Sequence, residues 1–121
     1  MILVDTSVWV GHLRAGDAAL KSLLDAGTVL GHPFVLGEIA LGNLRRRDLI
    51  LGALQDLPQV RAASDVEVLY FIDRHKLHGL GIGYVDAHLL AAVALTDGAR
   101  LWTSDRRLRA AAERLGLASQ S

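Results

Sequence analysis

The sequence contains no cysteine and few aromatic residues. The absence of cysteine excludes disulfides, thiolate nucleophiles and cysteine-ligated zinc sites. Aromatic residues make up only 5% of the 121 residues, so the core must consist mainly of leucine, valine, isoleucine and alanine. The longest apolar run, Leu89 to Leu95, is far shorter than the about 20 residues of a membrane-spanning helix. The start of the chain also lacks the pattern of a signal peptide. We therefore expect a soluble protein of the reducing cytoplasm with no membrane partner.

No excess of positive charge is present, because 13 basic residues balance 13 acidic ones. A nucleic-acid-binding protein is often basic overall, but local patches decide where a phosphate backbone can bind. The arginines do cluster, at Arg45, Arg46 and Arg47 and again at Arg106, Arg107 and Arg109. We predict that Arg45, Arg46, Arg47, Arg106 and Arg107 contact the phosphates of a nucleic acid. A solvated helix face or helix end is the alternative for both clusters.

The pattern of apolar residues predicts a single α/β domain over residues 1–121. Hydrophobic residues make up 51% of the chain, and no linker or internal repeat divides it. Short strands are expected at residues 2–5, 28–31 and 100–103 and near Val60, and helices at residues 7–13, 17–26, 34–44, 48–56, 64–77, 84–96 and 107–115. Strands that alternate with helices predict a three-layer α/β/α fold with a short, mostly parallel central sheet.

Two of these helices carry more specific signals. Ser64 followed by Glu67 is the pattern of a capping box, and Gly79 is the expected stop of that helix. Its predicted inward-facing residues are Val66, Leu69, Tyr70 and Leu77. The helix from Tyr84 to Thr96 is apolar almost all round, which indicates a buried central helix.

Four acidic residues stand at or near predicted element boundaries. Asp5 directly follows Ile2–Leu3–Val4, and ligands bind outside the carboxyl ends of strands in open α/β sheets. Asp105 follows another short strand and should emerge at the same edge if the two strands are parallel neighbours. Asp86 lies at the start of the central helix, and Glu38 lies about one turn into its own helix. Each acid taken alone has a simpler interpretation as a capping or loop residue.

A divalent cation is the physical reason to bring four carboxylates together. Two carboxylates about 5 Å apart repel by roughly 3 kcal/mol at an effective dielectric constant near 20. Mg²⁺ or Mn²⁺ converts these oxygens into ligands, eases deprotonation of a bound water and stabilises charge on a phosphoryl oxygen. The four acids therefore predict a metal site for phosphodiester hydrolysis.

These motifs together resemble a known family. The segments Ile2 to Ser7, Gly83 to Leu90 and Leu101 to Asp105, with Glu38, resemble PIN-domain ribonucleases, and the length is most similar to VapC-type toxins of toxin–antitoxin pairs. The resemblance implies a Mg²⁺- or Mn²⁺-dependent endoribonuclease with Asp5, Glu38, Asp86 and Asp105 as catalytic and metal-binding residues. It further implies supporting hydrogen bonds from Thr6 or Ser7 and Thr103, a homodimer, and a cognate antitoxin that covers the acidic cleft. RNA is then the nucleic acid that Arg45, Arg46, Arg47, Arg106 and Arg107 are predicted to contact.

Two other functions of α/β domains with an acid after the first strand lack residues that they require here. A phosphoacceptor domain of the receiver type would need a lysine at a late strand end, and a haloacid-dehalogenase-like phosphatase would need an aspartate where Ser7 stands. A non-catalytic module that binds RNA or protein stays open. His75 and His78 lack a third soft ligand for zinc. Trp9 and Trp102 are expected in the core or an interface, and Gly79, Gly81 and Gly83 are expected to form a flexible loop.

Overall fold

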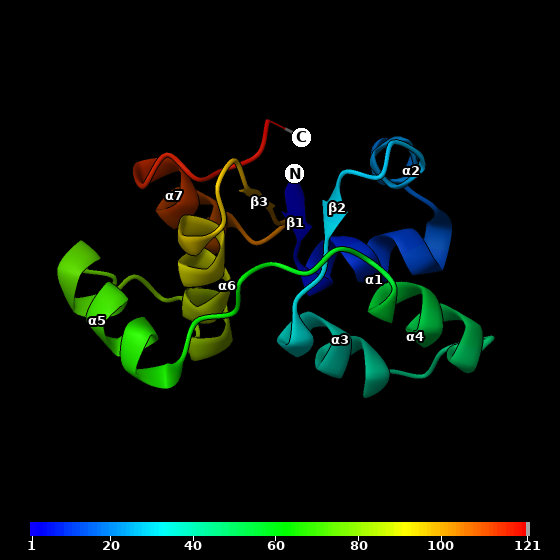
Figure 1. Ribbon diagram of the computed structural model, residues 1–121, viewed down its shortest axis with the longest axis horizontal. Helices are drawn as coiled ribbons and strands as arrows, with labels where there is room; N and C mark the ends of the chain where they lie inside the picture. Colours follow the sequence, from blue (N-terminus) through cyan, green and yellow to red (C-terminus); the bar gives the residue numbers. More distant parts are fainter. Residues whose placement is uncertain (121) are drawn as a thin grey trace.

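The centre of the fold is a three-stranded parallel sheet. The computed structural model describes residues 1–120 and orders the strands β2-β1-β3. Strand β1 (Ile2–Val4) pairs in parallel with β2 (Val29–Leu30) on one side and β3 (Arg100–Trp102) on the other (Figure 1). Leu3 and Val4 are fully buried. Successive strand residues point to opposite faces, so both faces of the first strand are covered.

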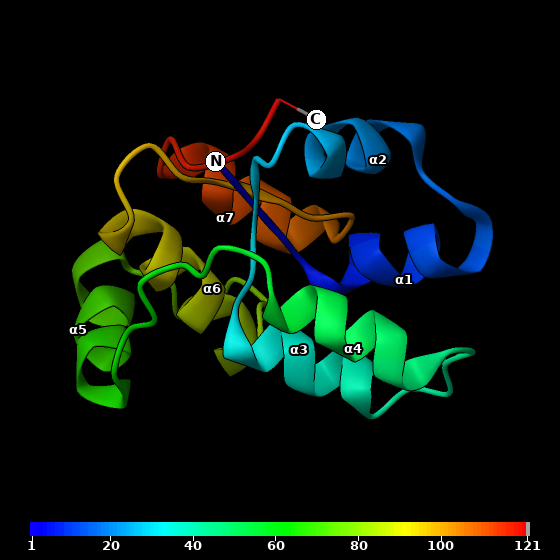
Figure 2. The ribbon, with the colours of Figure 1, turned by 45° about the vertical axis from the view of Figure 1, so that its right-hand side comes forward.

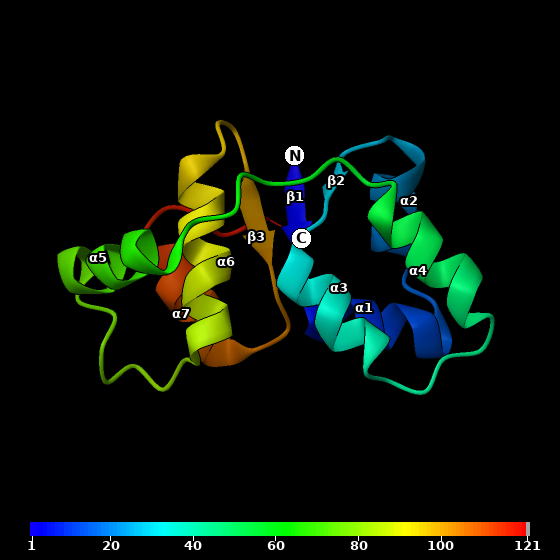
Figure 3. The same ribbon diagram turned by 60° about the horizontal axis from the view of Figure 1, so that its bottom comes forward.

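Seven helices surround this sheet in the described part of the chain. Figures 1 and 3 place α5, α6 and α7 on the side of β3, and α1 to α4 on the side of β2. Figure 2 shows α3 and α4 packed side by side as a helical hairpin. The predicted α/β class with a short parallel sheet is confirmed. The bounds are α1 Thr6–Ala15, α2 Ala18–Asp25, α3 Pro33–Ala40, α4 Arg47–Gln55, α5 Asp65–His75, α6 Tyr84–Leu95 and α7 Arg106–Arg114.

Helix α6 is the buried central helix that the sequence predicted. Every residue from 87 to 93 is buried, and the helix packs against both α5 and β3. The chain turns after it at Gly98, whose φ of 73° favours glycine because a Cβ atom is strained there. The packing of α6 on β3 thus holds Asp86, in its first turn, in place relative to the sheet.

The predicted helix over residues 34–44 was too long. Helix α3 ends at Ala40, and the next residue, Leu41, is 89% exposed. Arg46 adopts the left-handed conformation before α4 begins, and the Arg47 guanidinium donates to the Ala40 carbonyl at 3.0 Å. The loop between these two helices therefore begins at Leu41, earlier than the sequence pattern predicted. The strand predicted near Val60 was also wrong, because only an isolated bridge between Gly31 and Gln59 forms there.

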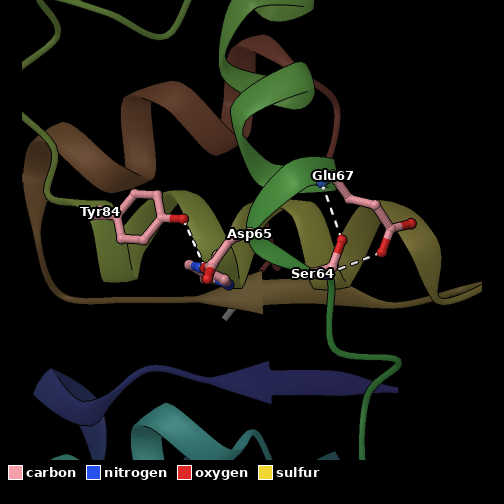
Figure 4. A network of polar contacts seen from close by, with 5 residues as sticks. Ser64, Asp65, Glu67 and Tyr84 are labelled. Atoms are coloured by element: carbon pink, nitrogen blue, oxygen red, sulfur yellow. Dashed lines mark hydrogen bonds and ion pairs between the residues drawn. The ribbon is translucent and has the colours of Figure 1, made fainter.

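Helix α5 begins as predicted but faces the core differently. The Ser64 hydroxyl accepts from the Glu67 amide at 3.2 Å, and the Glu67 carboxylate accepts from the Ser64 amide at 2.9 Å (Figure 4). The helix ends at His75, with Lys76 in the left-handed conformation, and not at Gly79. Of the predicted inward residues only Leu77 is buried. Val66, Leu69 and Tyr70 are exposed, because the helix turns Val68, Phe71 and Ile72 toward α6 instead.

The helices and the hydrophobic core bear on two broader expectations, the lack of a membrane span and the single domain. Within residues 1–120, no helix has both the length and the apolar character needed to cross a membrane. One large hydrophobic cluster joins residues from all three strands and from most helices. That the chain forms one domain over residues 1–121 stays a prediction, and this shared core is consistent with it.

Candidate active site

Asp5 and Asp105 emerge at the same edge of the sheet. The parallel register pairs Val4 with Trp102, and the Asp5 amide continues the ladder by donating to the Trp102 carbonyl at 2.9 Å. Asp5 therefore lies beside Thr103, and Asp105 follows two residues later. The predicted relation between these two strand ends is confirmed.

A hydrogen-bond network connects these strand ends. One oxygen of Asp5, Oδ2, accepts from the Thr103 hydroxyl at 2.7 Å and from the Ser7 hydroxyl at 2.9 Å. The Thr103 hydroxyl in turn accepts from the Asp105 amide at 3.0 Å, and the Ser7 hydroxyl accepts from the Ser104 amide at 3.1 Å. Asp5 and Thr103 are both buried. The Ser7 and Thr103 hydroxyls therefore fix the orientation of the Asp5 carboxylate, which has little access to water.

The other two acids reach this region from helices. Glu38 lies on α3, where its Oε1 accepts from the Thr6 hydroxyl at 2.7 Å. Asp86 lies in the first turn of α6, where its Oδ2 accepts from the Gly83 amide at 2.9 Å. Asp105 caps α7, because its Oδ1 accepts from the Leu108 amide at 2.9 Å. Asp86 and Asp105 thus have the capping contacts that a purely structural interpretation predicts.

The electrostatics of Asp86 link all four acids. Burial raises the pKa of the Asp86 carboxyl, and the negative charges of Asp5, Asp105 and Glu38 raise it further. The hydrogen bond from the Gly83 amide opposes this rise. Asp86 therefore lies close enough to three other carboxylates to feel their charge, although capping alone would leave it as an isolated acid.

The donor set fits a hard divalent cation. Each of the four carboxylates uses one oxygen for a protein donor, while its second oxygen accepts no hydrogen bond from residues 1–120. Carboxylate oxygens are the ligands that Mg²⁺ and Mn²⁺ prefer. In the described part of the chain, however, no three His, Asp or Glu side chains are already gathered as a set of metal ligands. A cation would have to draw the four second oxygens together.

All five arginines that are predicted to contact RNA are exposed. Arg47 in addition binds the end of α3 as described above. The Arg107 side chain lies over Gly81, where an added Cβ atom would come within 2.7 Å of its Nη1 atom. Gly81 also has a φ of 77°. The sequence pattern suggested only a flexible glycine loop here, and it gave no signal for this contact. The contact between Arg107 and Gly81 does not test whether the arginines bind RNA, which stays a prediction.

A second polar cluster beside the acids was not predicted. The Asp65 Oδ1 atom of α5 accepts from the Tyr84 hydroxyl at 2.8 Å (Figure 4). The same oxygen lies 3.1 Å from Nε2 of His88. The hydrogen bond from Tyr84 has the largest effect in lowering the pKa of Asp65, and the bond to His88 lowers it further. The same hydrogen bond to Asp65 raises the pKa of the Tyr84 hydroxyl. No sequence signal pairs Asp65 with residues so far along the chain. The cluster joins α5 to the first turns of α6.

The remaining histidines and tryptophans behave mostly as structural residues. His75 packs its ring on Phe71 at a centroid distance of 4.5 Å, and Trp9 is buried in the core. His32 is buried, and burial, followed by the charge of His88, lowers its pKa to about 4. His32 is therefore neutral at ordinary pH.

Comparisons with known proteins agree with this architecture. A family model for the PIN domain matches residues 2–114. The chain is also 51% identical over 118 residues to Ribonuclease VapC32 of Mycobacterium tuberculosis, from both strain CDC 1551 / Oshkosh and strain ATCC 25618 / H37Rv. Each match covers 98% of this chain and 95% of the relative. The chain therefore belongs to the PIN-domain family, with a VapC ribonuclease as a full-length relative, and the resemblance drawn from the sequence is confirmed.

Proposed function

We propose that this protein is a metal-dependent endoribonuclease of the VapC type, which hydrolyses RNA phosphodiesters as the toxin of a toxin–antitoxin pair. The observation that carries the proposal is that Asp5 and Asp105 follow neighbouring parallel strands at one edge of the sheet. Asp86 lies near enough that, besides burial, the negative charges of Asp5, Asp105 and Glu38 raise its pKa by repulsion. A fold gains nothing from such repulsion unless a cation relieves it. The relationship to a ribonuclease of nearly the same length supports the substrate class.

In this proposal the four carboxylates hold Mg²⁺ or Mn²⁺ through the oxygens that are not used by protein donors. Such an ion supplies a hydroxide at neutral pH and stabilises charge on the phosphoryl oxygen. The chain's own residues orient the ligands. Thr103 and Ser7 hold Asp5, and Thr6 holds Glu38. Positioning of this kind supplies much of the rate in phosphoryl chemistry.

Removal of one acidic ligand tests the proposal. The Asp5→Asn protein should lose cleavage of total cellular RNA in Mg²⁺, and the wild type should lose it in excess EDTA. Asp97→Asn is the matched control, because Asp97 is an exposed acid outside the site. Full cleavage by Asp5→Asn, or by the wild type in EDTA, would refute the metal-dependent mechanism at these acids, and loss of cleavage in Asp97→Asn would show that the assay does not report on the site. Binding of RNA without any cleavage would favour a non-catalytic RNA-binding module.

The partners follow from the same proposal. RNA is the substrate, a second copy of the chain forms a homodimer, and a cognate antitoxin covers the acidic site. Exposed apolar residues on the described chain, such as Leu41, Leu49 and Val66, provide surface for protein contacts. Sedimentation at micromolar concentration tests the homodimer. Co-purification with the product of the neighbouring reading frame tests the antitoxin, and sequencing the RNA ends after brief induction identifies the target.

A further inference from the structure

Two aromatic rings are exposed near the acidic residues. Phe34 and Tyr84 are 39% and 47% exposed, although aromatic residues make up only 5% of the sequence. Each ring packs against the same buried imidazole, that of His88, with a centroid distance of 4.7 Å in both cases. The two rings therefore belong to one aromatic cluster with a solvent-accessible side.

Both rings are held in fixed orientations. The Tyr84 hydroxyl donates to Asp65 at 2.8 Å (Figure 4), and His88 contacts the same carboxylate oxygen at 3.1 Å. Phe34 packs edge-on against the buried His32 ring at 5.2 Å. A side chain that is already ordered loses little conformational entropy when a ligand stacks on it. The cluster is thus prepared for binding before a ligand arrives.

The cluster lies next to the candidate acidic ligands. Phe34 precedes Glu38 by four residues on α3, which places both on one face of that helix. Tyr84 is the first residue of α6, and the Asp86 carboxylate bonds back to the Gly83 amide at the same end of the helix. Each aromatic ring therefore shares a helix turn or a helix face with an acid of the site.

We infer that Phe34 and Tyr84 form a stacking platform for one unpaired nucleobase of the RNA, next to the phosphate held at the acids. This inference rests on the proposed nuclease function. Bases of single-stranded RNA splay out and stack on aromatic side chains, and this contact is tolerant of base identity. The acidic site binds backbone and carries no information about bases, so a base contact beside it gives the enzyme a preference for unpaired RNA.

The test compares two probes that carry the same phosphate charge. One is a short single-stranded oligoadenylate, and the other is an abasic ribose-phosphate oligomer of equal length. Binding is measured by fluorescence anisotropy with Ca²⁺ in place of Mg²⁺, and a gel checks that the probes stay intact. The wild type should bind the oligoadenylate about tenfold more tightly, as expected for one stacked base.

The variants separate stacking from other effects. Tyr84→Leu and Phe34→Leu should each reduce the ratio of the two affinities toward one and leave abasic binding unchanged. Tyr84→Phe should keep most of the ratio, because it retains the ring and its packing on His88 and loses only the hydroxyl bond to Asp65. Tyr70→Leu is the matched control, since Tyr70 is an exposed aromatic residue on α5. Thermal melts check that each variant is folded. If Tyr84→Leu does not fold, Phe34→Leu alone tests the stacking platform.

Different outcomes refute different claims. An unchanged affinity ratio in the folded leucine variants overturns the platform. If that unchanged ratio is accompanied by loss of the dimer in sedimentation, the platform is likewise overturned. The second result would assign the rings to a protein interface. A wild type that cuts no RNA but prefers the oligoadenylate, with that preference lost in the leucine variants, refutes the nuclease and leaves the platform.

Discussion

The hydroxyl of Thr103 should contribute to both stability and activity. It is buried, donates to Asp5 at 2.7 Å and accepts from the Asp105 amide at 3.0 Å. Thr103→Val keeps the side-chain shape and removes both hydrogen bonds. A hydrogen bond to a charged group contributes about 1.5–3 kcal/mol, so we expect a loss of about 2 kcal/mol in the free energy of unfolding. For a chain of this size that corresponds to a fall of about 8 °C in Tm.

The same change should reduce RNA cleavage at least about tenfold, because Asp5 loses one of its two hydroxyl donors. Stability is measured by urea unfolding in EDTA, and cleavage is measured in saturating Mg²⁺ well below Tm. Thr103→Ser should restore most of both quantities, since it keeps the hydroxyl.

Thr28→Val provides the matched control. Its hydroxyl donates at 3.1 Å to the Leu23 carbonyl, away from the acids, so its loss should cost about 1 kcal/mol and leave cleavage unchanged. If Thr103→Val unfolds at the wild-type urea concentration and cleaves RNA at the wild-type rate, then the network around Asp5 has no role in orienting it.

Three further predictions concern charge at the site. The folded-state pKa of Asp86 is raised above the ordinary value of 3.8, so its ionised form disfavours folding once the pH exceeds that range. In EDTA at pH 7, the Asp86→Asn protein should therefore unfold at a higher urea concentration than the wild type. This difference in stability should vanish below about pH 4, where Asp86 is protonated in both states. A variant that is less stable than the wild type at pH 7 contradicts the prediction. Mg²⁺ at 100 times its Kd should stabilise the wild type by about 2.7 kcal/mol in thermal melts but not Asp5→Asn, and equal stabilisation of both would place the ion elsewhere. Asp65→Asn should return the Tyr84 phenol toward its ordinary pKa, measured by ultraviolet titration, and an unchanged titration would show that Asp65 does not hold Tyr84 in solution.

The strand-borne part of the candidate site could be predicted from sequence. Asp5 and Asp105 each follow a short apolar strand, and parallel neighbours necessarily present their carboxyl ends at one edge. The helix start at Asp86 was equally clear, because Gly83 and the apolar run after it define where α6 begins. These predictions depend only on local patterns and on one rule of sheet geometry.

Orientation around a helix axis was the part that local patterns could not determine. Val66, Leu69 and Tyr70 have helical spacing and were expected in the core, yet Val66 is 77% exposed. Val68 and Ile72 have the same spacing and occupy the interface with α6. Two apolar stripes on one helix give equal periodicity, so only the position of the partner helix decides which stripe is buried.

The same limit applies to contacts between distant polar residues, and it bears on how the site is held. Asp65 and Tyr84 are separated by 19 residues and meet only because α5 packs on α6. Helix α6 therefore has a contact to α5 near the end that carries Asp86. A change on α5 that moves this end of α6 must alter the position of Asp86, although α5 carries none of the four carboxylates. The geometry of the acidic site is in this sense a property of the packing of α5 as well as of the residues that would bind the metal.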